Sequence, residues 1–326
     1  MRQNLVFLLL LAPIGFLTAD TRQVVLQADA LHGQGKFAEA KSLLLGSVTG
    51  AATGKEKAEL YWRLSRETLE LGGIAEEAGR PASEVLKICE EGDGFANAAI
   101  ESDPQNDLGY YWKSANIGRW GQVKGVMNAL FKTGPIRDLL VKVLDLNPER
   151  SDAYYVLGQL YRELPGWPVS FGNTDAAVSL GRRAVDLRMS QYRAGREETL
   201  DFDFYTELAK TLYKRNWTAA ARVKMQEGKK AKYGESRTPL ERDCLYEAVV
   251  GLEDMSDREE AAALLLWSIE EMEKLPRLTQ AEAQALRTAK VMLKSLAAAR
   301  AARRSPSRSR GRPSCPRGFR PCPPST

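Results

Sequence analysis

Apolar residues between Thr21 and Arg304 recur every three to four positions, and no stretch alternates convincingly between apolar and polar residues. A period of 3.6 residues is typical of helices that bury one face, whereas strict alternation would indicate strands. Sequences that end helices punctuate this pattern, such as Asp-Pro at 103–104 and Asn-Pro at 147–148. The chain is therefore expected to be all-α, with about fourteen helices and no sheet.

Four segments of the chain align with one another without gaps. Each begins with a tyrosine, at positions 61, 110, 154 and 205, and each has a small residue four positions later. The small residues are Ser65, Ser114, Gly158 and Ala209. Because a small residue one turn after a large one lets a second helix pack closely, the alignment predicts the first helices of four helix pairs.

These segments resemble the first helix of the tetratricopeptide repeat, which carries an aromatic residue, a Leu-Gly pair and a second aromatic residue. The best match consists of Tyr154, Leu157, Gly158 and Tyr161, followed by Ala177 and Ala184 on the second helix. The repeat starts at 61, 110, 154 and 205 are 49, 44 and 51 residues apart, so these units are longer than the usual repeat of about 34 residues. The resemblance implies an α-α superhelix, that is, a tetratricopeptide-type solenoid with expanded repeats.

The stretch 60–187 is also similar to the regulator of microtubule dynamics family and its bacterial relatives, through Tyr-Trp-Arg-Leu-Ser at 61–65 and Leu-Asn-Pro at 146–148. It likewise resembles the periplasmic T-component of tripartite ATP-independent periplasmic (TRAP) transporters, whose members are exported helical-repeat proteins. The resemblance implies a scaffold for protein-protein interaction, and one option for its partner is the solute-binding protein of a transporter.

A solenoid of helix pairs leaves part of each first helix facing a concave groove. If the repeated tyrosines occupy the fourth position of the repeat, three of the four units place an aromatic residue in this groove. Aromatic and arginine side chains dominate binding energy at interfaces, so we expect a protein or peptide partner. The candidate groove residues are Trp62, Arg66, Tyr111, Tyr155, Gln159, Arg162, Lys210 and Tyr213. The alternative is that the aromatic residues among them pack between repeats as ordinary core.

The stretch 165–172 inserts two prolines and two aromatic residues between helices. Trp167 and Phe171 are candidate contact residues on this loop, unless the loop folds back over a hydrophobic face. A second function is open as well: a carrier of an apolar small molecule. Its internal cavity would be framed by Trp112, Trp120, Trp167 and Phe171.

Residues that could carry catalysis are scarce. His32 is the single histidine, which excludes sites that need two imidazoles. Adjacent acidic pairs such as Glu76-Glu77 diverge on a helix and are typical of solvated faces. The glycines at 121 and 125 lack the Gly-Lys-Ser/Thr ending of a phosphate-binding loop. We therefore expect no enzyme activity, no cofactor and no metal site.

The region after the expected repeat array (20–237) has three further amphipathic segments, at 240–252, 257–275 and 279–302, which we expect to cap the solenoid within 238–302. The last is rich in alanine and basic residues, which leaves self-association open. Residues 303–326 are rich in Arg, Ser and Pro and predict a disordered tail. Because 297–326 holds eight arginines and no acidic residue, the net charge of +5 conceals a mildly acidic body, for which we expect no nucleic-acid partner.

Residues 1–19 have the features of a secretory signal peptide: Arg2, the apolar run 5–11 and a small-residue cleavage site at 17–19. An uncleaved N-terminal anchor is the alternative, and no later apolar run is long enough to span a bilayer. We expect export to the periplasm or cell envelope. In that oxidising compartment Cys315 and Cys322 are close enough in sequence to close a disulfide loop, whereas Cys89 and Cys244 are expected to be buried thiols.

Overall fold

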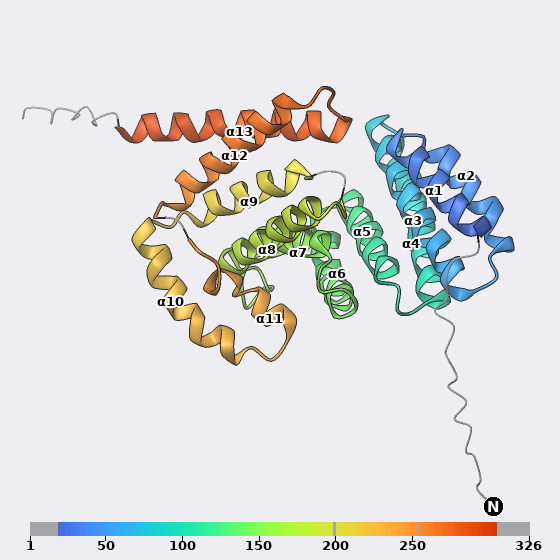
Figure 1. The fold of residues 1–326 in the computed structure, drawn as a ribbon, viewed down its shortest axis with the longest axis horizontal. Coiled ribbons are helices and arrows are strands. Elements are labelled where there is room, and N and C mark those ends of the chain that lie inside the picture. The colour runs from blue at the N-terminus through green and yellow to red at the C-terminus, as the bar shows by residue number, and fades with distance from the viewer. Residues whose placement is uncertain (1–18, 198–199, 253, 305–326) are drawn as a thin grey trace, which may run out of the picture.

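The computed structural model describes residues 19–304, apart from 198–199 and 253. This part of the chain folds into thirteen α-helices and two short 3-10 helices, without a strand. The all-α prediction is thereby confirmed, with one α-helix fewer than expected. Figure 1 shows the helices following one another in a curved row that starts with α1–α4, with α13 lying across its other end. The predicted leader, except Ala19, and the tail beyond Arg304 lie outside the described residues.

The first part of the row is built from consecutive helix pairs. It comprises α1 (Ala19–Gly33), α2 (Phe37–Ser47), η1 (Val48–Gly50), α3 (Gly54–Glu77), α4 (Ala82–Ser102), α5 (Asp107–Lys124), α6 (Val126–Leu146), α7 (Ser151–Glu163) and α8 (Thr174–Arg193). The second part comprises α9 (Phe202–Arg215), α10 (Ala219–Glu235), α11 (Pro239–Asp243), η2 (Tyr246–Ala248), α12 (Asp257–Lys274) and α13 (Gln280–Arg304). None of the described helices has the length and apolarity needed to cross a bilayer.

Three helix pairs show the repeat directly: α3 packs on α4, α5 on α6 and α7 on α8. The hydroxyl of Tyr110 donates to the carbonyl of Pro104 over 3.3 Å, and Tyr154 donates to Pro148 in the same way over 3.2 Å. Gly158 lets α7 approach α8 closely, since a Cβ atom there would lie 3.3 Å from the backbone nitrogen of Gly181. The tyrosine columns and the small residues thus perform the packing role that the sequence predicts.

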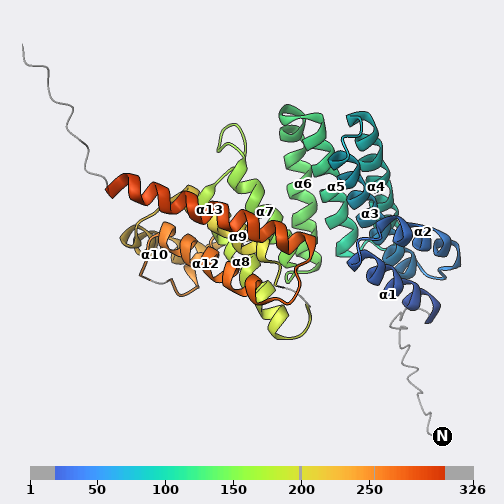
Figure 2. The ribbon, with the colours of Figure 1, turned by 90° about the horizontal axis from the view of Figure 1, so that it is seen from above.

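The helix that carries the fourth aligned segment, α9, pairs differently from α3, α5 and α7. It packs on α8 and on α12, whereas α10 contacts mainly η2 and α11 (Figures 1 and 2). The chain from α10 to η2 therefore forms an excursion, after which α12 takes the place beside α9. The next helix, α13, packs on both α12 and α9, which returns the end of the described chain to the repeat array.

One expected helix is shorter than predicted. The segment 240–252 forms only α11 and the 3-10 turn η2. The amide of Gln226 donates to the carbonyls of Glu247 and Val250, over 2.7 Å each, and so takes up backbone acceptors that a longer helix would use. The interruption turns Glu247 into the interior, where its side chain is 1% exposed.

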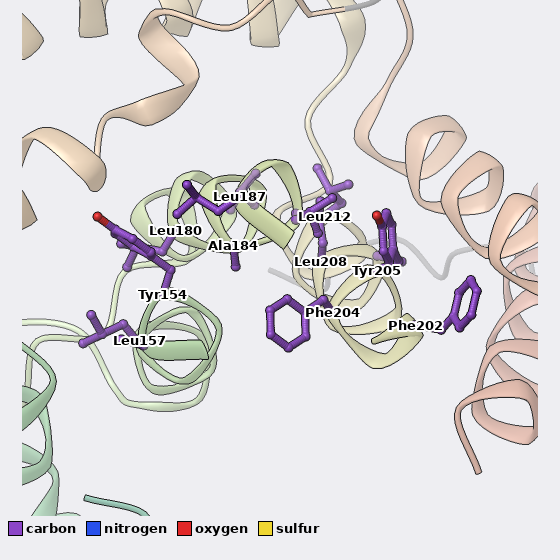
Figure 3. Packing of buried hydrophobic residues seen from close by; sticks show 14 of the residues in the cluster. Tyr154, Leu157, Leu180, Ala184, Leu187, Phe202, Phe204, Tyr205, Leu208 and Leu212 are labelled. Atoms are coloured by element: carbon purple, nitrogen blue, oxygen red, sulfur yellow. The ribbon is translucent and has the colours of Figure 1, made fainter. Parts of the chain in front are cut away.

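The apolar core falls into two clusters. A small one lies under α1–α3, and the larger one joins α6, α7, α8, α9, α12 and α13. Figure 3 shows how side chains from three of these helices meet, including Leu157 of α7, Leu180 of α8 and Leu208 of α9. Since α13 belongs to the larger cluster, its position is fixed by apolar packing as well as by chain connectivity.

Candidate functional site

A cavity of about 650 Å³ lies on the concave side of the row, between α5, α7, α9 and the first turns of α13. We call it the concave groove. Its walls include Tyr111 and Trp112 of α5, Asp152 and Tyr155 of α7, Asp203, Phe204, Glu207 and Lys210 of α9, and Glu282 of α13. This volume lies in the range typical of ligand-binding pockets, about 300–1,000 Å³.

The groove exists because α5 and α7, the first helices of two neighbouring pairs, diverge. α3 and α5 pack against each other, as neighbouring repeats do, but α5 and α7 make at most marginal contact among the described residues. Since α6 also touches α7 only lightly, the second and third helix pairs splay apart on the concave side. The first turns of α13 border the resulting space, and His32 of α1 lies at its edge.

Aromatic side chains form one part of the lining. The rings of Tyr155 and Phe204 stack with their centroids 4.3 Å apart and their planes 10° from parallel, which joins α7 to α9. On the α5 side, Tyr111 and Trp112 meet edge to face at 5.2 Å. Such rings provide large and rigid contact areas, because each has only two side-chain torsions to fix on binding.

Carboxylates form the other part, and most of them are held by arginines behind the wall. Arg188 of α8 binds Asp152 over 2.8 Å. Arg162 of α7 binds Glu207 over 2.6 Å, and Lys210 pairs with the same carboxylate from within the groove. These contacts fix the carboxylates in place without removing the negative character of the lining.

Asp203 differs from its neighbours in its partner. The carboxylate faces the groove, and its hydrogen bond comes from the hydroxyl of Tyr155 rather than from a basic side chain. Although its side chain is open to solvent in the groove, the surrounding walls desolvate it and raise its pKa to about 6, more than the Tyr155 hydrogen bond lowers it. The nearby carboxylates of Asp201 and Glu207 raise the pKa further.

Five of the eight predicted groove residues lie in or directly behind this wall. Tyr111, Tyr155 and Lys210 line the groove. Gln159 hydrogen-bonds Tyr155, and Arg162 positions Glu207 from behind. Desolvation raises the pKa of both lining tyrosines, so each hydroxyl stays protonated.

The other three lie elsewhere. Trp62 is 6% exposed and packs under the guanidinium of Arg63, 3.9 Å from the ring centre, and this guanidinium binds Asp29 of α1 over 2.8 Å. Arg66 binds Asp29 of α1 over 2.7 Å. Through Asp29, α1 thus binds the face of α3 that the repeat pattern assigns to the groove. Tyr213 lies under Arg258 of α12, 4.5 Å from its ring centre.

The loop residues do not share one site. Trp167 is 90% exposed, whereas Phe171 packs against Tyr161, at 5.1 Å between ring centres. Trp120 lies beneath Lys124 and Lys132. The prediction that Trp112, Trp120, Trp167 and Phe171 frame one internal cavity is therefore wrong. Of these four residues only Trp112 lines the concave groove, and the indole of Trp167 is exposed to solvent.

The groups with chemical reactivity lie outside the groove or at its edge. The imidazole of His32 is 2.9 Å from the buried carboxylate of Glu67, an ion-pair geometry between α1 and α3. Cys89 is buried and Cys244 half-buried, both as free thiols. Burial raises the pKa of Cys244 to about 12, which makes this thiol a poor nucleophile at neutral pH.

The repeat pattern missed two parts of the groove. Asp203 and Phe204 lie in the first turn of α9, and the acid-aromatic sequence Asp-Phe-Asp-Phe at 201–204 is the signal that could have drawn attention to them. Glu282 comes from α13, outside the aligned repeats. Its place in the wall depends on a fold-back that no local pattern encodes.

Known proteins resemble this chain in sequence over its first half and in fold over most of its length. A family model described as regulator of microtubule dynamics protein 1-3 matches residues 24–166, which run from α1 to just beyond α7. Regulator of microtubule dynamics protein 1 of Bos taurus is 24% identical over 164 residues, covering 46% of this chain and 51% of that protein. The same protein of Pongo abelii is 24% identical over 162 residues, covering 46% and 50%.

The chain thus spans about half the length of the curated relatives it matches. In fold, it is similar to the crystal structure of a thermophilic TPR protein of Thermus thermophilus, with a TM-score of 0.50 and 14% sequence identity. That similarity covers 85% of this chain and 99% of the other. The chain has a tetratricopeptide-type α-α superhelix, a fold typical of protein-interaction scaffolds.

Proposed function

We propose that this protein is a non-enzymatic scaffold that binds an extended segment of a partner protein in the concave groove. The observation that carries the proposal is the joint lining of a 650 Å³ cavity by aromatic rings and fixed carboxylates from four helices. Ring faces supply apolar contact area, and carboxylates fix the orientation of polar groups in the bound segment. The acidic lining disfavours a wholly apolar small molecule, which would leave these charges desolvated and unpaired.

The test is recovery of the partner from an extract of the native organism. Lys210→Ala removes a groove side chain that pairs with Glu207 three residues earlier, and Lys230→Ala is its matched control. Lys230 makes the same type of pair with Glu227 on α10, away from the groove. We expect Tyr155→Ala to lose the partner, Lys210→Ala to recover more of it because the groove becomes more acidic, and Lys230→Ala to recover the native amount. Circular dichroism confirms that all three variants fold. Equal recovery with every folded variant would refute the proposal.

The compartment and the partner's class are part of the same proposal. The leader-like residues 1–19 support export to the periplasm or cell envelope, and a transporter's solute-binding protein is the partner class that the resemblance to T-components implies. N-terminal sequencing of the protein from a periplasmic fraction should begin at Asp20 or Thr21. A protein found in the cytoplasm with Met1 intact would exclude export.

A further inference from the structure

The concave groove has a surplus of negative charge. Its lining includes five carboxylates and one lysine, Lys210. The five are Asp152, Asp201, Asp203, Glu207 and Glu282. Lys210 and Arg162 offset Glu207, and the single guanidinium of Arg188 is shared between Asp152 and Asp201. Among the described side chains, no basic group pairs with Asp203 or Glu282, so the surplus is concentrated at these two carboxylates. A ligand that complements the groove must therefore bring positive charge.

The arrangement around Asp203 specifies the form of that charge. Its carboxylate lies beside the stacked rings of Tyr155 and Phe204, and it accepts a hydrogen bond from the Tyr155 hydroxyl. A guanidinium can bind a carboxylate through paired N–H groups while its flat face rests on an aromatic ring. An ammonium group lacks the flat face and the paired donors, so this combination favours arginine over lysine.

The protein already uses this combination on the other side of the same wall. Arg188 lies 5.1 Å from the centre of the Phe204 ring and binds Asp152 over 2.8 Å. The wall thus holds one guanidinium between an aromatic face and a carboxylate from behind. Asp203 presents a second carboxylate to the open side, where no described basic side chain pairs with it.

The chain carries a segment with the matching charge. Residues 305–320 contain five arginines and no lysine, aspartate or glutamate. They are Arg308, Arg310, Arg312, Arg317 and Arg320. The segment follows α13, whose residues from Ala281 to Thr288 border the groove.

Chain length permits this segment to reach the groove. From Thr288 to Arg304, where α13 ends, the helix extends about 24 Å at 1.5 Å per residue. Beyond Arg304 a chain reaches at most about 26 Å by Arg312 and about 53 Å by Arg320, at about 3.3 Å per residue. The later arginines can therefore return along α13 to Asp203 without any change in the described helices.

We propose that the concave groove binds arginine side chains, and that its occupant in the free protein is the chain's own segment 305–320. This inference rests on the proposed binding role of the groove and names the chemistry of what it takes. A partner would then compete with the segment, so only a partner with a better-matched basic stretch would displace it.

The experiment uses the full-length chain and a fluorescein-labelled synthetic peptide of residues 305–320 with Ser in place of Cys315. Fluorescence anisotropy measures its binding to the native chain and to a full-length variant in which all five arginines of the segment are Gln. Because the native segment competes with the probe, we expect the Gln variant to bind it at least about tenfold more tightly. A peptide with Lys for each Arg should bind more weakly than the probe.

Site specificity is tested in the Gln variant. Adding Asp203→Asn should weaken probe binding by about tenfold or more, since hydrogen bonds to charged groups contribute about 1.5–3 kcal/mol. Asp138→Asn is the matched control, because Asp138 is a 68% exposed aspartate on α6 outside the groove. It should leave binding unchanged. Equal affinity of both variants, or no probe binding to the Gln variant at micromolar concentration, would overturn the inference.

Two further readouts separate the remaining explanations. Sedimentation that shows tail-dependent dimers of the native chain would overturn binding within one chain, because the segment of a second copy would then be the occupant. Loss of a partner through Tyr155→Ala, without any probe binding, would refute this inference alone and leave the proposed function standing. If probe binding requires Asp203 but Tyr155→Ala recovers as much partner as the native chain, the proposed function alone is refuted.

Discussion

Replacing Glu247 with Gln should destabilise the protein strongly, although Glu247 does not line the concave groove. Its carboxylate is 1% exposed and contacts three cations: Arg215 over 2.5 Å, Lys229 over 2.8 Å and Arg182 over 3.1 Å. The whole cluster is balanced, with four cations and four carboxylates. They are Arg182, Arg215, Arg222 and Lys229 with Asp175, Glu247, Asp257 and Glu260.

The amide of Gln would leave one positive charge uncompensated in this interior. Breaking a buried pair by removing one partner costs about 3–5 kcal/mol. At roughly 2–4 °C per kcal/mol for a protein of this size, the midpoint of thermal unfolding should fall by roughly 6–20 °C. The control is Glu227→Gln, because Glu227 is 65% exposed and pairs with the 53% exposed Lys230. An exposed pair contributes at most about 1 kcal/mol.

The pH dependence provides a second signature. Burial by itself raises the pKa of Glu247, but the hydrogen bonds and charges of Arg215, Arg182 and Lys229 outweigh it and hold the pKa well below its usual range. A lowered pKa contributes stability that is present above the unfolded value of about 4.3 and is lost as the pH falls below it. Glu247→Gln should therefore lose most stability near pH 7 and differ less from the native chain at pH 3.

Differential scanning calorimetry and urea unfolding at pH 7 and pH 3 measure both effects. Adding Lys229→Met to Glu247→Gln restores the charge balance, so the double variant should recover part of the loss. A loss below about 1 kcal/mol at pH 7, matching that of Glu227→Gln, would refute the view that the cluster is buried and charge-balanced.

Three further predictions test the packing, the loop and the groove. Gly92→Ala should destabilise the protein by about 1–3 kcal/mol in urea unfolding, since its Cβ atom would lie 2.1 Å from the amide oxygen of Asn116. The control is Gly94→Ala, an exposed position in the same helix with open space around it, which should stabilise the protein by up to about 1 kcal/mol. Trp167→Ala should change the free energy of unfolding by less than about 0.5 kcal/mol, because the indole is 90% exposed; a larger loss would show that the loop packs on the body. Binding of the arginine-rich probe should weaken as the pH falls through about 6, because Asp203 then becomes neutral, and Asp203→Asn should abolish this step in an anisotropy titration from pH 5 to 8.

The helix pairs could be predicted from the sequence because their determinants are local. The tyrosine at 154 and the glycine at 158 lie one turn apart on one helix, and Asn147-Pro148 ends the helix before it. These signals need no knowledge of the remaining chain. The same is true of α12, which begins with Ser256 at its N-cap, where a capping box forms.

The groove could be predicted only in part, because its boundaries depend on contacts between distant segments. The repeat pattern places Trp62 and Tyr155 at equivalent positions, yet Trp62 is buried under Arg63, which binds α1, while Tyr155 opens onto the groove. The pattern assumes that every unit stacks alike, and this chain departs from that at the junction of α5 with α7. A departure of this kind results from packing along the whole row, so no single repeat encodes it.

The buried charge cluster explains why the groove has a fourth wall. Arg215 at the end of α9 binds Asp257 at the start of α12 over 2.9 Å, which holds α12 beside α9 in the place where a regular array would put α10. Only five residues separate α12 from α13, so fixing α12 also fixes where α13 begins. The first turns of α13 then carry Glu282 to the groove. An ionic cluster outside the groove thus adds one of its five carboxylates, by selecting which helix packs beside α9.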